Sequence, residues 1–106
     1  MTEILYRKYY DRHLIIIEGH SNFSQKGEDI VCSAVSCLGF TLLNTLTDEV
    51  GDERAKFVRN IVRDGYMCLE VLPFSFAKER IQAIFDTVIT GFCMVSEEYP
   101  DYVKFK

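Results

Sequence analysis

Residues 55–72 have the sequence AKFVRNIVRDGYMCLEVL, and this stretch predicts a β-hairpin. Side chains alternate over residues 55–63, with Phe57, Arg59 and Ile61 on one side of the strand. Asp64 and Gly65 then suit a two-residue turn in which both central residues have positive φ. Residues 66–72 return as the second strand. An antiparallel sheet is favoured, because parallel strands need a longer crossover between them.

A second hairpin is expected near the N-terminus. Residues 3–9 are rich in β-forming residue types, and residues 10–12 suit a turn. Residues 13–18, HLIIIE, form the returning strand, and its isoleucine run is typical of a central position. His13 opens this strand, so we expect it in the turn or on the surface. Residues 102–106 alternate again and predict a short edge strand.

Apolar residues recur at helical spacing in two segments, from residue 29 to about 50 and from 75 to 98. Asp29 is expected to cap the first helix, and Gly51 to end it. The element order is therefore ββαββα, possibly with the terminal strand. This order predicts an α+β fold, a two-layer sandwich with a mostly antiparallel sheet of four or five strands and two helices on one face.

The length of 106 residues indicates one domain, residues 1–106, and the net charge is −4. An acidic balance gives no electrostatic drive toward nucleic acid, so we expect no direct nucleic-acid partner. No apolar run approaches the roughly 20 residues of a membrane span, so no membrane partner is expected. The start, Met1-Thr2-Glu3-Ile4, does not resemble a signal peptide, which favours a cytoplasmic location. Charged pairs such as Asp48-Glu49 are expected on the solvated surface.

The four cysteines and two histidines show no metal-binding spacing, so neither a metal nor a cofactor is expected. Cys37, Cys68 and Cys93 are expected to be buried or inert. Cys32 differs, because a cap at Asp29 makes it the third helical residue. The positive end of the helix dipole would then lower the pKa of its thiol and favour the nucleophilic thiolate.

A base and an oxyanion site complete a nucleophilic centre. His20 ends the second strand, and a short loop, residues 19–28, leads from there to the helix start. We therefore expect His20 within hydrogen-bond reach of Cys32, with unpaired N–H groups of the helix start as oxyanion donors. Ser36 lies one turn beyond Cys32 on the same face, where it lines the site or bonds back to a helix carbonyl.

The pair Gly19-His20 is followed by Gly27-x-Asp29-Ile30-Val31-Cys32-x-Ala34-Val35-Ser36. This combination resembles the ribosomal-processing cysteine protease family called Prp, also known as YsxB-like proteins. The resemblance extends over the whole chain and its ββαββα order. It implies that Cys32 is the nucleophile and His20 the catalytic histidine, with Gly19, Asp29 and Ser36 supporting the site.

Two positions of the loop carry further expectations. Ser21 stands where the family often has alanine, and one small residue for another leaves the assignment intact. Phe23 is either a contact for apolar substrate residues or a packing anchor when the loop closes over the peptide. The resemblance also implies a small homodimer that removes the N-terminal extension of a large-subunit ribosomal protein, after aromatic or bulky apolar residues. We expect the second helix and residues 101–106 to offer the dimer surface.

Two other functions are compatible with these residues. One is a non-catalytic module that binds a ribosomal protein and in which Cys32 has no chemical role. The other is a cysteine hydrolase or acyltransferase acting on a small molecule. Selective alkylation of Cys32 at neutral pH distinguishes an activated cysteine from the binding module, and a panel of peptides and simple thioesters separates the two enzymes.

Overall fold

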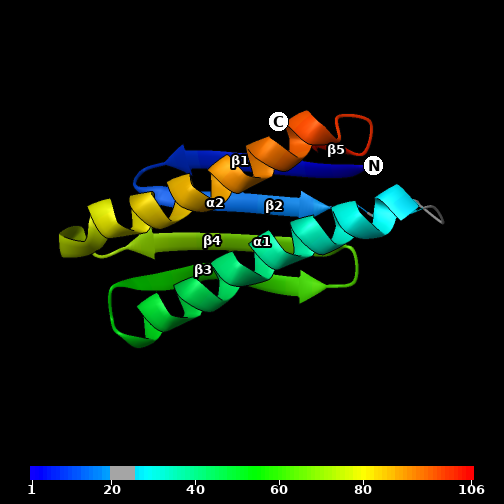
Figure 1. Cartoon of the computed structure of the whole chain (residues 1–106). Helices are drawn as coiled ribbons and strands as arrows, with labels where there is room; N and C mark the ends of the chain where they lie inside the picture. The colour runs from blue at the N-terminus through cyan, green and yellow to red at the C-terminus, as the bar shows by residue number, and fades with distance from the viewer. Residues whose placement is uncertain (20–25) are drawn as a thin grey trace.

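The computed structural model describes residues 1–19 and 26–106, with side chains described for residues 1–19 and 30–106. Figure 1 shows two layers, a sheet and two helices that both lie on one of its faces. The strands are β1 (Thr2–Tyr9), β2 (Arg12–Glu18), β3 (Ala55–Arg63), β4 (Tyr66–Pro73) and β5 (Val103–Phe105). The helices are α1 (Lys26–Gly51), a short 3₁₀ helix η1 (Ser75–Ala77) and α2 (Lys78–Glu98). The predicted α+β sandwich is confirmed.

The strand order across the sheet is β3-β4-β2-β1-β5. Both predicted hairpins are present, and β2 pairs with β4 in antiparallel orientation, so β2 is the central strand, between β4 and β1. The terminal strand β5 joins β1 in parallel orientation. Parallel pairing is possible there because α2 separates β5 from the preceding strand and carries the chain back along the sheet.

The core lies between the helices and the sheet face that they cover. Ile15 and Leu69, which pair across β2 and β4, are fully buried, as are Leu42 and Leu46 of α1 and Phe85 of α2. Apolar spacing along each helix predicted these contacts, since residues three or four apart share one face. The opposite face of the sheet carries no helix among the described residues (Figure 1), and we call it the open face.

The two hairpin turns differ in geometry, and only the β3–β4 turn departs from its prediction. Tyr10 and Asp11 both have positive φ, at 50° and 66°, so the β1–β2 turn is the one with two left-handed residues. At the β3–β4 turn only Gly65 has positive φ, at 72°, and the expectation for Asp64 is wrong. A turn with one left-handed residue needs glycine only at its second position.

The alternation predicted along β3 is interrupted by an irregularity between Phe57 and Arg59, which typically reflects a β-bulge. An extra residue reverses which side chains face the helices. Val62 therefore pairs with the buried Met67 on the helix-facing side, while Ile61 pairs with Cys68 on the open face. This reversal brings Val62 to the pocket described below.

Two side chains that were expected at the surface are buried. His13 is 1% exposed and Glu49 is 3% exposed. Glu49 lies near the end of α1, where it accepts hydrogen bonds from Arg54 and Arg80, and these partners lower the pKa of its carboxyl. The His13 ring stacks on Phe85 with centroids 4.6 Å apart, and its Nδ1 lies 2.6 Å from the Tyr6 hydroxyl. Sequence patterns around either residue do not reveal such partners.

Burial of His13 should make the fold sensitive to acid. Desolvation is the largest cause that lowers the pKa of the ring, from 6.5 to about 4. Between these values the unfolded chain binds a proton that the folded chain does not, so the free energy of unfolding falls as pH falls. Over the full window the loss is about 3 kcal/mol.

Urea unfolding at pH 7 and pH 4.5 measures this effect. The variant His13→Gln should be less stable at pH 7, yet it should lose less stability on acidification than the wild type. Carboxylates titrate equally in both proteins, so the difference isolates the histidine. An identical pH dependence in the two proteins would contradict this account.

Helix α1 also corrects the expectation about apolar length. Its residues Ile30–Gly51 are long enough to cross a membrane, and their most apolar 18-residue window has a mean hydropathy of 1.7. Serine, threonine and asparagine residues interrupt the apolar residues of this helix. The mean hydropathy of the window nevertheless stays as high as that of a membrane-spanning helix. Only 28% of the most apolar window is buried, but Val31, Leu42 and Leu46 are fully covered by the sheet and α2. A helix that packs on a sheet passes the same test, so this composition alone assigns no membrane role.

Candidate active site

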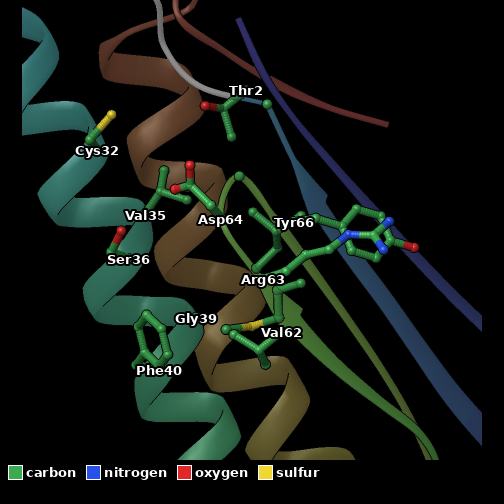
Figure 2. A pocket seen from close by; sticks show the side chains of 14 residues that line it. Thr2, Cys32, Val35, Ser36, Gly39, Phe40, Val62, Arg63, Asp64 and Tyr66 are labelled. Carbon is green, nitrogen blue, oxygen red and sulfur yellow. The ribbon is translucent and has the colours of Figure 1, made fainter.

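A pocket of about 420 Å³ lies between α1 and the β3–β4 hairpin. On the helix it is lined by Cys32, Ser36 and Phe40, which Figure 2 shows on successive turns of α1. The spacing of four residues places these side chains on one face of the helix. The predicted proximity of Ser36 to Cys32 is therefore present, and Phe40 extends the same row.

The sheet side of the pocket is mainly apolar. Ile17, Val62 and Met67 line it, and Val35 faces them from the helix. The charged lining residues Arg63 and Asp64 lie at the hairpin turn. Cys32 is partly buried at this pocket. A thiol beside an apolar hollow suits the reaction of a peptide that inserts an apolar side chain there.

Arg63 and Tyr66 form a pair beside the turn. The Arg63 guanidinium lies 4.6 Å from the centroid of the Tyr66 ring, within the range of a cation–π contact. Figure 2 shows both side chains directed away from α1, whereas Asp64 lies between the hairpin and the helix. The acidic side chain is thus the charged group nearest to the helix wall of the pocket.

The start of α1 differs from the sequence prediction. The helix begins at Lys26, so residues 26–28 belong to it and not to the predicted loop. Asp29 is the fourth helical residue and Cys32 the seventh, and the expectation that Asp29 is the N-cap is wrong. Aspartate is common both at the cap and within the first turn, so its presence did not determine the boundary.

This shift changes the argument for Cys32. The backbone N–H groups without helical partners belong to residues 26–29, one turn before the cysteine. The effect of the helix dipole fades within the first turn. The helix start therefore contributes less to the reactivity of the thiol than the sequence suggested, and its N–H groups are not adjacent to the sulfur.

Three predicted site residues, His20, Ser21 and Phe23, lie outside the described residues, as does the side chain of Asp29. Gly19, which precedes His20, is described in detail. Its φ is 102°, and its N–H donates a 2.9 Å hydrogen bond to the carbonyl of Gly65 in the hairpin turn. The end of β2 is thus joined to the turn that lines the pocket.

Gly19 should not tolerate a side chain. A Cβ atom there would lie 2.3 Å from the carbonyl oxygen of Met1, and positive φ is already strained for other residues. We expect Gly19→Ala to lower the free energy of unfolding by about 1–3 kcal/mol. It should also slow peptide cleavage, because the chain leading to His20 must shift.

Urea unfolding and cleavage rates measure the two effects. Gly51→Ala is the matched control, since no atom lies within 4 Å of the Cβ position there and its φ is not in the positive range. That variant should keep wild-type activity. Equal behaviour of the two variants would show that the close approach at Gly19 has no role.

Among the described residues, no group of three or more histidine, cysteine, aspartate or glutamate side chains is placed to hold a metal ion. Sequence reasoning missed most of the other lining residues, among them Ile17, Phe40, Val62, Asp64 and Met67. Each was assigned to a strand, helix or turn, but no sequence signal placed the hairpin beside α1. The helical spacing of Cys32, Ser36 and Phe40 was the one available indication for Phe40.

Comparisons with known proteins agree with this geometry. Residues 1–104 match the family model described as cysteine protease Prp. The chain is 25% identical over 109 residues to the ribosomal processing cysteine protease Prp of Bacillus subtilis (strain 168), covering 98% of this chain and 95% of that protein.

Two solved structures share the fold. SMU.848 from Streptococcus mutans is 26% identical with a TM-score of 0.72, covering 100% of this chain and 92% of that one. The essential ribosomal processing protease Prp from S. aureus, solved in complex with a substrate peptide, has a TM-score of 0.74 at 18% identity. That alignment covers 100% of this chain and 98% of the S. aureus chain, and it supports the fold.

Proposed function

The chain belongs to the cysteine protease Prp family, and on this premise we propose that it removes the N-terminal extension of a large-subunit ribosomal protein. The observation that carries the proposal is Cys32 in the lining of a mainly apolar pocket, on a chain that matches the family over residues 1–104. The name of the Bacillus subtilis relative, ribosomal processing cysteine protease, supports the substrate class.

Cys32 is the proposed nucleophile and His20 the proposed base. His20 accepts the thiol proton, and the Cys32 sulfur attacks the scissile carbonyl carbon. The C–N bond then breaks, the departing amine takes the proton from His20, and the extension remains attached as a thioester. A water molecule hydrolyses the thioester, which releases the carboxylic acid and restores the thiol.

The remaining site residues have supporting roles in this proposal. Ser36 lines the pocket one turn from Cys32, where its hydroxyl contacts the bound peptide. Gly19 holds the end of β2 against the hairpin turn. Asp29 belongs to the first turn of α1, and Ser21 and Phe23 to the segment that precedes it. The apolar lining, including Val35, Phe40 and Met67, suits a bulky apolar residue before the cleaved bond.

We also propose a homodimer that acts in the cytoplasm. None of the four cysteines, all of which lie in the described part of the chain, forms a disulfide, which fits a reducing compartment.

The apolar side chains of the last strand are unsuited to the dimer contact, because Val103 is in the core and Phe105 packs against it. Exposed Met94 on α2 remains available. Sedimentation at micromolar concentration tests the dimer, and a species of 12.3 kDa would count against it.

The decisive experiment is incubation with the extended ribosomal protein, followed by mass measurement of the product N-terminus. A single cut after an aromatic or bulky apolar residue supports the proposal. Binding of the substrate without any cut favours the non-catalytic module. Hydrolysis of simple thioesters and amides without cleavage of the protein favours a small-molecule hydrolase.

A further inference from the structure

The acidic net charge conceals a separation of charge between the two layers. The five strands carry seven basic residues and three acidic ones. The helices α1 and α2 carry three basic residues and eight acidic ones. The sheet is therefore positive and the helical layer negative, although the whole chain is −4. The prediction that nucleic acid is not a partner used the overall charge of the chain, and that overall charge does not show the positive surface of the sheet.

Most of the positive charge of the sheet lies in one half of the open face. Arg59 pairs with Glu70, and Arg7 is in register with both through Leu14 of β2. Arg12, two residues before Leu14, forms an ion pair with Glu70. Lys56 lies three residues before Arg59 on the edge strand β3. It pairs with Leu72, whose side chain is on the open face, as that of Glu70 is. We call these residues, Arg7, Arg12, Lys56 and Arg59, the basic cluster.

Glu70 lies within the basic cluster but does not cancel it. Its carboxylate is 2% exposed and accepts a hydrogen bond from the Tyr9 hydroxyl. Arg12 and Arg59 approach it at 3.5 and 3.3 Å. Arg7 donates instead to the carbonyl oxygen of Lys106, at 3.5 Å. The four side chains of the basic cluster and the one carboxylate of Glu70 sum to a formal charge of +3. The guanidinium groups extend past the carboxylate into solvent, since the Arg59 side chain is 61% exposed.

Exposed aromatic side chains lie at the same end of the sheet. Tyr10, in the β1–β2 turn, is 91% exposed, and Phe76, in η1, is 74% exposed. A 3.0 Å ion pair between Asp11 and Lys78 holds the turn beside the start of α2. Figure 1 shows the β1–β2 turn, the start of α2 and the start of β3 at one end of the molecule, opposite the β3–β4 turn that lines the pocket.

We propose that the basic cluster and these aromatic side chains bind single-stranded nucleic acid. Phosphates are attracted to a surface with excess arginine and lysine, and unstacked bases pack on exposed aromatic rings. A second copy of this chain would bring the same positive charge against the cluster, so self-association on this face is opposed. The inference is independent of the proteolytic function, because the surface lies at the end of the sheet remote from Cys32.

Fluorescence anisotropy with labelled 12-nucleotide oligo-uridine and oligo-thymidine at 50 and 200 mM salt tests the proposal. We expect affinity to fall with salt, with a logarithmic slope of about 2–3 for three or four phosphate contacts on a single strand. Tighter binding of the uridine oligomer would assign RNA as the natural ligand, and equal binding would assign single strands of either kind.

Two variants separate the contributions of charge and stacking. Lys56→Glu should weaken binding about tenfold and reduce the salt slope. Phe76→Ala should weaken binding about tenfold while the salt slope stays unchanged. Both leave Glu70 with its two arginines, so the sheet keeps its buried carboxylate paired.

The matched control is Lys104→Gln, at the other end of the open face. It should bind like the wild type, and all three variants should cleave peptide at the wild-type rate. Absence of binding at 50 mM salt would overturn the proposal. So would binding that Lys56→Glu and Phe76→Ala leave unchanged, or duplex binding as tight as that of the single strands.

Discussion

Replacing Cys32 with serine should abolish cleavage of the extended ribosomal protein while leaving the fold intact. Serine is nearly isosteric with cysteine, and the partly buried position on α1 tolerates it. A hydroxyl is far harder to ionise than a thiol, and a histidine that activates a thiol does not deprotonate it. We expect the rate to fall at least about 10⁴-fold.

Mass spectrometry of the substrate measures the loss, and urea unfolding confirms that the variant is folded. Cys37→Ser is the matched control, because Cys37 lies on the same helix, is exposed and is absent from the pocket lining. It should cleave normally. Normal cleavage by Cys32→Ser would rule out Cys32 as the nucleophile of a cysteine protease. A wild-type protein that binds the extended ribosomal protein but does not cleave it would favour the binding module.

Local pattern predicted the architecture of this fold well. The Asp64-Gly65 turn and the apolar spacing of the two helices determined the ββαββα order, which the structure confirms. The prediction was wrong where the start of a helix was inferred from a single residue. Asp29 suits a cap and a first turn equally, and the helix begins three residues earlier at Lys26. The bulge near Val58 has no distinct sequence signal, so the alternation after it was assigned to the wrong faces.

Burial of polar groups was the least predictable property. His13 and Glu49 are polar residues at element ends, where exposure is the usual outcome. Their burial depends on partners far along the chain, Phe85 for the histidine and Arg80 for the glutamate. Such pairs follow from how the helices cross the sheet. A single sequence does not contain that information in any local pattern.

For the site, the sequence identified Cys32 and Ser36 on the helix wall and missed Phe40 and the hairpin residues of the opposing wall. Cys32 and Ser36 were linked by their spacing of four residues. Val62 and Met67 belong to a hairpin more than 25 residues away. The bulge determines that Val62 faces the pocket. A motif therefore locates the nucleophile, whereas the shape of the pocket that selects the peptide depends on tertiary packing.

The second large effect is expected at His20. Replacing it with alanine should slow cleavage by about 10²–10⁴-fold, because the thiol loses its base and the departing amine loses its proton donor. Residual activity should remain, since thiolate present in solution equilibrium still attacks the carbonyl. Cleavage rates at saturating and limiting substrate measure the change, and the loss should fall mainly on kcat.

Imidazole rescue distinguishes a catalytic His20 from a residue that only shapes the site. The small base enters the space left by the removed ring, so added imidazole should restore part of the rate to His20→Ala. The double variant with Cys32→Ser should show no rescue, because the nucleophile is absent. His13, the only other histidine, is buried against Phe85, and His13→Gln should retain cleavage at pH 7. Wild-type rates for His20→Ala would assign the base to another group, and slow rates without rescue would assign His20 a structural role.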